Sequence, residues 1–129
     1  IAAHEMPYTR NRLIRLRNYF VERVRHEIPQ SRLNGHPYKR LPGNVNFSFA
    51  GIDATALLVL LEEEGICASA GSACNTGQTR ISHVIEAIRV PDAYAAGSVR
   101  FTMGRDTTKR DVDACVDALK RSVLILRKT

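Results

Sequence analysis

The stretch Asn44-Val-Asn-Phe-Ser-Phe49, together with the apolar run that follows it, indicates the fold class. Apolar and polar residues alternate along this stretch, which predicts a half-buried strand. Asp53 can then cap a helix that runs to about Glu64, and Gly65 stands where such a helix is expected to stop. A strand that leads directly into a helix indicates a mixed α/β domain.

The sequence before this stretch predicts one helix and one loop. Residues 10–28 carry apolar side chains at helical spacing, and Pro29 helps to end that pattern. Residues 31–43 contain glycine and proline pairs that are typical of a loop, with room for one short strand before Gly35.

The sequence after it predicts two more strands and two more helices. Residues 66–69 fit a short buried strand, residues 82–89 a short helix, and residues 98–103 a second alternating strand. Thr108 and Asp111 have the spacing of a capping box. The final helix carries an apolar stripe made of Val112, Val116, Leu119, Val123 and Leu126. We therefore expect a small α/β sandwich, with a three- or four-stranded sheet and helices on one or both faces.

The composition is that of a single globular domain without a membrane span. The chain has 129 residues, of which 44% are hydrophobic and 25% charged. Its longest apolar run, residues 54–61, is too short to cross a bilayer, and no signal peptide is visible. Three cysteines without paired spacing favour a reducing, cytoplasmic compartment. Because the first residue is Ile1, we expect a processed chain or a part of a longer one.

The net charge of +6 leaves a nucleic-acid-binding function as one alternative. Much of the excess lies early in the chain, at Arg10, Arg12, Arg15, Arg17, Arg23 and Arg25. No aromatic interleaving or nucleic-acid motif accompanies these arginines. We therefore favour a solvated helix face, or a face that meets an acidic partner or another domain.

The three cysteines are predicted to have different roles. Cys115 lies on the apolar stripe of the final helix and Cys67 in the expected strand, so both fit small buried hydrophobes. Cys74 lies in the run Ala70-Gly-Ser-Ala-Cys-Asn-Thr-Gly77, whose small residues predict an exposed, mobile loop. Such a thiol is either reactive or an incidental surface cysteine, and the residues alone leave both open.

Arg100 is the second singular residue. It interrupts an apolar strand and is predicted to point away from the core, where it either binds a carboxylate or covers the sheet. His83 could move protons but fits a helix-packing role better. Asn44 and Asn46 are interpreted as residues that satisfy backbone groups. The cysteines and histidines show no metal-ligand spacing, so we expect no metal site.

Three motifs in order resemble the C-terminal part of cysteine desulfurases of the nitrogen-fixation and iron–sulfur-cluster type. They are Leu41-Pro-Gly-Asn-Val-Asn-Phe-Ser-Phe49, Gly65-Ile-Cys-Ala-Ser-Ala-Gly-Ser-Ala-Cys74 with Ser82-His-Val84, and Ser98-Val-Arg-Phe-Thr-Met-Gly-Arg-Asp-Thr-Thr108. Those enzymes are fold-type I, pyridoxal-phosphate enzymes of the class V aminotransferase group. The resemblance implies that residues 1–30 are a connecting helix region and residues 31–129 the small C-terminal domain, with the large cofactor-binding domain absent.

The resemblance also implies a function for the full-length protein. Cys74 matches the cysteine that takes sulfur from L-cysteine as a persulfide and leaves L-alanine, and Arg100 matches the arginine that holds the substrate carboxylate. The persulfide would pass to a sulfur-acceptor or scaffold protein for iron–sulfur clusters or thio-cofactors. The full-length enzyme would be a cytoplasmic homodimer with pyridoxal phosphate, without nucleic-acid or membrane partners.

The sequence also departs from the family pattern. It has no His-Lys pair to attach pyridoxal phosphate; its lysines are Lys39, Lys109, Lys120 and Lys128. We therefore expect the chain alone to bind no cofactor and to be inactive. After Cys74 the family often has Thr-Ser and then Glu-Pro, whereas this sequence has Asn75-Thr76 and Arg80-Ile81. This difference leaves the identity of the sulfur-acceptor protein open. A stand-alone sulfur-carrier or protein-binding module and, within the class, a selenocysteine lyase remain alternatives.

Overall fold

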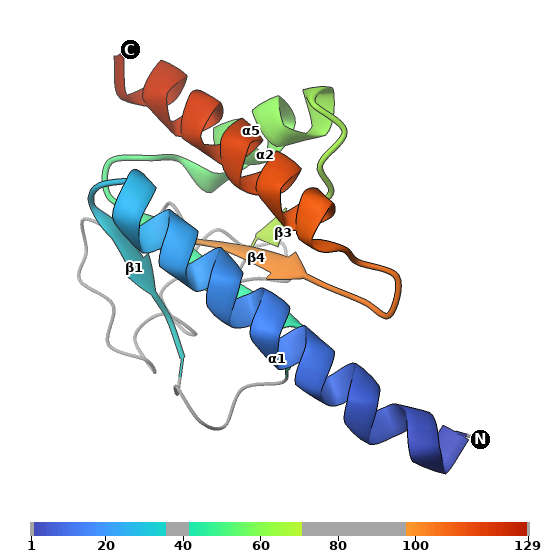
Figure 1. Ribbon diagram of the computed structural model, residues 1–129. Coiled ribbons are helices and arrows are strands. Elements are labelled where there is room, and N and C mark those ends of the chain that lie inside the picture. The colour runs from blue at the N-terminus through green and yellow to red at the C-terminus, as the bar shows by residue number, and fades with distance from the viewer. Residues whose placement is uncertain (1, 36–41, 71–97, 129) are drawn as a thin grey trace.

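The computed structural model describes residues 2–35, 42–70 and 98–128 (Figure 1). They form a four-stranded sheet of β1 (Ser31–Leu33), β2 (Asn44–Phe49), β3 (Ser69–Ala70) and β4 (Ser98–Thr102), in the order β1-β2-β4-β3. All three strand pairs are antiparallel. The described helices are α1 (Ala2–Glu27), α2 (Ala54–Glu63) and α5 (Lys109–Lys128). The prediction of an α/β domain with a small sheet is therefore confirmed.

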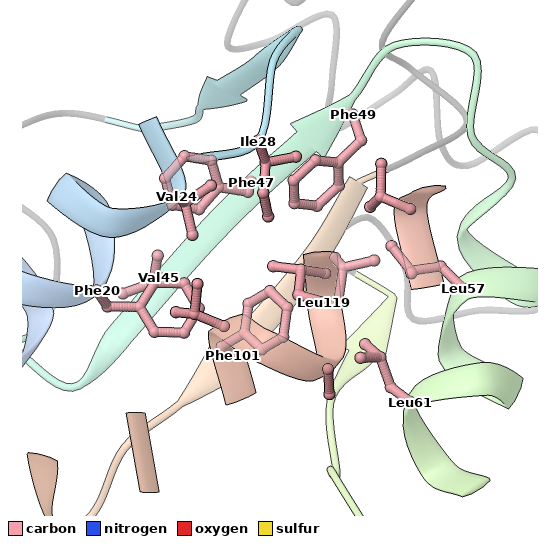
Figure 2. Close-up of a cluster of buried hydrophobic side chains, with 14 of the residues drawn as sticks. Phe20, Val24, Ile28, Val45, Phe47, Phe49, Leu57, Leu61, Phe101 and Leu119 are labelled. Atoms are coloured by element: carbon pink, nitrogen blue, oxygen red, sulfur yellow. The ribbon is translucent and has the colours of Figure 1, made fainter. Parts of the chain in front are cut away.

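The described helices all pack on one face of the sheet. Figure 2 shows their apolar side chains meeting the core-facing residues of β2 and β4. The ring of Phe20 on α1 packs against two rings of the sheet, with its centroid 5.1 Å from that of Phe101 and 6.2 Å from that of Phe47. Leu57 and Leu119 are fully buried on the α2 and α5 sides. Because so many apolar side chains leave water here, this cluster supplies the main stabilisation of the fold.

The helix boundaries largely follow the local signals in the sequence. Asp53 caps α2, and its side chain accepts a hydrogen bond from the backbone N–H of Thr55. The capping box of α5 is also present. The backbone N–H of Thr108 donates to Asp111 Oδ2 at 2.9 Å, and that of Asp111 donates to Thr108 Oγ1 at 3.1 Å.

Two boundaries differ from the predictions. The helix expected over residues 10–28 begins earlier, at Ala2, and its N-terminal end projects beyond the rest of the described domain (Figure 1). The strand expected at residues 66–69 begins only at Ser69, because only Ser69 and Ala70 pair with β4. The helix expected at residues 82–89 lies outside the described residues. Among the described residues, no helix combines the length and the apolar character needed to span a membrane.

Candidate functional site

The face of the sheet opposite the helices is polar. Strand residues alternate between faces, so the cross-strand partners of polar residues lie on the same side. All four strands contribute polar side chains to this face. The described ones are Arg32, Asn44, Asn46, Ser48, Ser69, Ser98, Arg100 and Thr102. None of them is acidic, so this face favours an anion over a cation.

Arg100 lies in the middle of this face. It is exposed, while its chain neighbours Val99 and Phe101 are buried in the core, as predicted. Across the strands, Arg100 is the Cα partner of Asn46 on β2 and of Ser69 on β3. Within the described part of the chain, its guanidinium takes part in no hydrogen bond or ion pair. A rigid central strand thus presents a cation between two neutral polar residues.

A buried hydrogen-bonded network lies beside Arg100. The side-chain Nδ2 of Asn34, just after β1, donates to Asn46 Oδ1 at 3.1 Å and to Ser48 Oγ at 2.7 Å. The hydroxyl of Ser98 donates to the same Asn46 oxygen at 2.9 Å. Asn34, Ser48 and Ser98 are each at most 5% exposed. Sequence reasoning missed this network, because Asn46 alone suggests only a backbone partner; the signal was its place two residues before Ser48 on one strand face.

Cys74 and His83 lie outside the described residues. The nearest described element is β3, which ends at Ala70, four residues before Cys74. β3 pairs with β4 directly beside Arg100, through the partners Ser69 and Arg100. The structure therefore places the start of the segment that carries Cys74 next to the strand that carries Arg100.

The other two cysteines differ in exposure. Cys67 is exposed, so the prediction of a buried strand position is wrong: the strand starts two residues later, and the turn at Gly65 leaves Cys67 at the edge. Cys115 is half-buried against the core, and this burial raises the pKa of its thiol to about 12. Both line one cavity of about 440 Å³ on the helix side of the sheet.

Five of the six arginines of α1 fall into two groups. Arg12 donates to the backbone carbonyls of Arg105 and Thr107, and Arg23 pairs with Glu27, Asp113 and Asp117. These contacts hold α1 against α5 and the loop before it. Arg10, Arg15 and Arg25 are exposed. Part of the early positive charge therefore serves packing, which a function in nucleic-acid binding would not require.

A comparison with known families gives the classification. The family described as Aminotransferase class-V matches residues 1–115, which is most of the chain. The chain belongs to the class-V aminotransferase family.

Within the class-V aminotransferase family, curated relatives are similar over nearly the whole chain. The cysteine desulfurase IscS of Dictyoglomus turgidum is 43% identical over 127 residues, which cover 98% of this chain and 32% of that protein. The cysteine desulfurase IscS of Methanosarcina thermophila is 40% identical over 127 residues, covering 98% of this chain and 31% of that protein. The chain thus spans about a third of the length of these relatives.

Solved structures share the fold. A NifS-like protein matches with a TM-score of 0.79 at 22% identity, over 97% of this chain and 30% of that chain. A NifS-like protein from Rickettsia africae matches with a TM-score of 0.73, over 88% of this chain and 29% of that chain. The match confirms that this chain has the fold of one part of a fold-type I class-V aminotransferase.

The described residues do not fit the cofactor that class-V aminotransferases imply, pyridoxal phosphate. That cofactor needs a lysine at the active site. The described lysines all lie on α5, on the helix side of the sheet; Lys109 lies over the ring of Tyr19, and Lys120 pairs with Glu27. Arg100 is on the opposite face. No described lysine can therefore meet a substrate that Arg100 holds, and within the described parts no cluster of three potential metal ligands occurs.

Proposed function

We propose that this chain is the C-terminal part of a cysteine desulfurase, which transfers the sulfur of L-cysteine to Cys74 and releases L-alanine. The single observation that carries the proposal is the placement of Arg100, an exposed guanidinium on a polar, acid-free sheet face beside the strand that leads to Cys74. The similarity to relatives named cysteine desulfurase over 98% of the chain supports the same function.

Arg100 is the substrate-binding residue in this proposal. A guanidinium forms two parallel hydrogen bonds with a carboxylate, which fixes both the position and the orientation of the bound amino acid. β4 is paired on both sides, by β2 and by β3, so the base of the arginine is held rigidly. A substrate whose carboxylate is bound by Arg100 would have its sulfur held in one orientation on the polar face of the sheet.

Cys74 is the sulfur acceptor. Four extended residues span at most about 14 Å, so the covalent connection to β3 keeps its thiol within reach of a substrate held at Arg100. The thiolate attacks the cysteine sulfur, a S–S bond forms and the C–S bond breaks. The electron pair of that bond stays with carbon, which takes up a proton. L-cysteine and one thiol thus give L-alanine and one persulfide.

The remaining parts of the proposal concern the full-length protein. Pyridoxal phosphate would be held by residues outside this chain, so we expect the chain alone to show no turnover. The persulfide would then pass to a sulfur-acceptor or scaffold protein for iron–sulfur or thio-cofactor synthesis. We expect a cytoplasmic homodimer.

The test uses a longer polypeptide that includes the rest of the family domain, supplied with L-cysteine and pyridoxal phosphate. Peptide mass spectrometry would detect added sulfur, and released alanine would be measured in parallel. The Cys74→Ser variant should lose both signals. The matched control is Cys67→Ser, because Cys67 is also exposed and should be dispensable.

Three outcomes would contradict the proposal. Alanine release that persists unchanged in the Cys74→Ser variant would remove this residue from the reaction. Sulfur found on the Cys67 peptide in place of the Cys74 peptide would show that Cys67, and not Cys74, is the sulfur acceptor. Sulfur received only from another protein, without alanine, would favour a stand-alone sulfur carrier.

A further inference from the structure

Ser69 lies directly beside Arg100 on the polar face of the sheet. The two residues are Cα partners in the antiparallel pair of β3 and β4, so their Cβ atoms lie about 4.5–5.5 Å apart. Arg100 is exposed and Ser69 is half-buried. Within the part of the chain that the structure describes, neither the guanidinium nor the hydroxyl takes part in a hydrogen bond. Two neighbouring donors are therefore available on the strand pair that leads toward Cys74.

The two sides of Arg100 differ in the side chains that they present. On the β2 side, the amide of Asn46 accepts two hydrogen bonds of the buried network. On the β3 side, Ser69 is followed by Ala70, and both side chains are small. An arginine has a stem of three methylene groups, which can lie along the sheet and bring the guanidinium over a serine of the adjacent strand. The β3 side is therefore the one on which Arg100 can share a ligand with a neighbour.

A serine hydroxyl complements a guanidinium in the binding of a carboxylate. The guanidinium has only donors, whereas the hydroxyl has one donor and two acceptor lone pairs. Ser69 can therefore accept a hydrogen bond from Arg100 and at the same time donate one to an anion that Arg100 holds. A carboxylate has two oxygens and accepts from both groups. Because Ser69 is half-buried, its hydroxyl meets less competition from water than an exposed hydroxyl would.

We propose that Ser69 is a second carboxylate-binding residue, whose hydroxyl donates a hydrogen bond to the same carboxylate that Arg100 binds. The assignment of this carboxylate to L-cysteine rests on the proposed function, but the anion site itself rests only on the pair of Ser69 and Arg100. Contacts from two strands fix the carboxylate more closely than one long side chain does. They also hold it at β3, from which the chain continues to Cys74.

The experiment is an NMR titration of the 129-residue chain with sodium acetate, with sodium chloride of equal ionic strength as the reference. Acetate carries the carboxylate without any reacting sulfur. The side-chain Nε–H signal of Arg100 and the backbone amide signal of Ser69 should shift together and saturate at one common Kd. Acetamide at equal concentration should shift neither, because it carries no charge that attracts the guanidinium.

Variants separate the hydroxyl from the fold. Ser69→Ala should raise the Kd for acetate about three- to tenfold, the net effect of one lost hydrogen bond. Ser69→Thr keeps a hydroxyl on a residue that suits a strand, and it should bind acetate nearly as tightly as the unaltered chain. Thr102→Val is the matched control, because exposed Thr102 also carries a hydroxyl on this face of β4, and it should leave the Kd unchanged. The backbone amide signals report whether each variant is folded.

Three results would overturn the proposal. If folded Ser69→Ala binds acetate as tightly as the unaltered chain, the hydroxyl is no contact. If Ser69→Thr weakens binding as much as Ser69→Ala, the loss comes from a change in β3 and not from the missing hydroxyl. If the Arg100 signal does not respond beyond the chloride reference, this face holds no carboxylate site. None of these readouts depends on sulfur chemistry, so failure of persulfide formation with intact acetate binding would contradict the proposed function and leave this inference standing.

Discussion

Arg23 and Glu27 face each other one turn apart on α1 and are joined at two points. Arg23 Nε and Nη2 donate to Glu27 Oε2 and Oε1, each at 2.6 Å, and Lys120 of α5 adds a third contact at 2.9 Å. These partners lower the pKa of Glu27 to about 2, with the Arg23 hydrogen bonds as the largest cause. The pair thus connects α1 to α5 through an ionised carboxylate.

This lowered pKa predicts acid sensitivity. A carboxyl group whose pKa falls from 4.5 to about 2 on folding contributes stability above pH 4.5, and the contribution is lost as the pH falls toward 2. Thermal unfolding from pH 7 to pH 2 should show a smaller acid-induced drop in Tm for Glu27→Gln than for the unaltered chain. Glu63→Gln, on the exposed surface of α2, is the control. Parallel curves for all three proteins would contradict the prediction.

Arg100→Lys should weaken substrate binding in the longer polypeptide. Lysine keeps the charge but loses the second parallel hydrogen bond. The KM for L-cysteine should therefore rise about ten- to a hundredfold, while kcat changes less because Cys74 is intact. Steady-state alanine release measures both constants. Arg32→Lys, on the same sheet face, should behave like the unaltered protein; an unchanged KM in Arg100→Lys would exclude a carboxylate contact.

Gly43→Ala should loosen the end of the β2–β4 pair. The N–H of Met103 donates to the Gly43 carbonyl at 2.7 Å, and a Cβ at Gly43 would come 2.4 Å from the Met103 oxygen. Since that neighbour is backbone, relief requires a strand shift, and we expect a loss of about 1–3 kcal/mol in unfolding free energy by urea titration. Gly104→Ala meets no atom within 4 Å and should be nearly neutral. Equal losses of unfolding free energy in Gly43→Ala and Gly104→Ala would show that the backbones of Gly43 and Met103 do not lie this close together.

Leu119→Ala and Leu124→Ala make a matched pair on α5. Leu119 is fully buried, whereas Leu124 is 57% exposed. Truncation of the buried leucine leaves a cavity and should cost about 2–5 kcal/mol, whereas truncation of the exposed one should change unfolding free energy by less than about 0.5 kcal/mol. Urea unfolding measures both. Similar costs would mean that the core does not lie where the fold places it.

Cys67 and Cys115 should differ in alkylation by iodoacetamide at pH 8. Cys67 is exposed, while Cys115 is half-buried with a pKa raised to about 12, so very little of its thiol is ionised. Timed peptide mass spectrometry should find Cys67 modified early and Cys115 only after denaturant is added. Fast modification of Cys115 in the folded chain would show that α5 is not packed as described.

Several features could be predicted from the sequence because they depend on nearest neighbours along the chain. The alternation of residues 44–49 and 98–102 sets which side chains face the core, and it predicted correctly that Arg100 points away from it. The spacing of Thr108 and Asp111 predicted the capping box that begins α5. The motifs around Cys74 and Arg100 predicted the family, although the role of Cys74 stays a prediction.

Other features depend on contacts between distant parts of the chain, and only the tertiary structure decided them. The order β1-β2-β4-β3 places Asn46 beside Arg100 and brings Asn34 and Ser98 to one amide oxygen, although these residues are far apart in the sequence. Pairing with β4 also decides that β3 starts after Cys67, which leaves that thiol exposed. Local sequence patterns determine which face of the sheet each side chain occupies. The pairing of strands determines its neighbours, because hydrogen bonds between strands join residues whose separation in the sequence follows no fixed spacing.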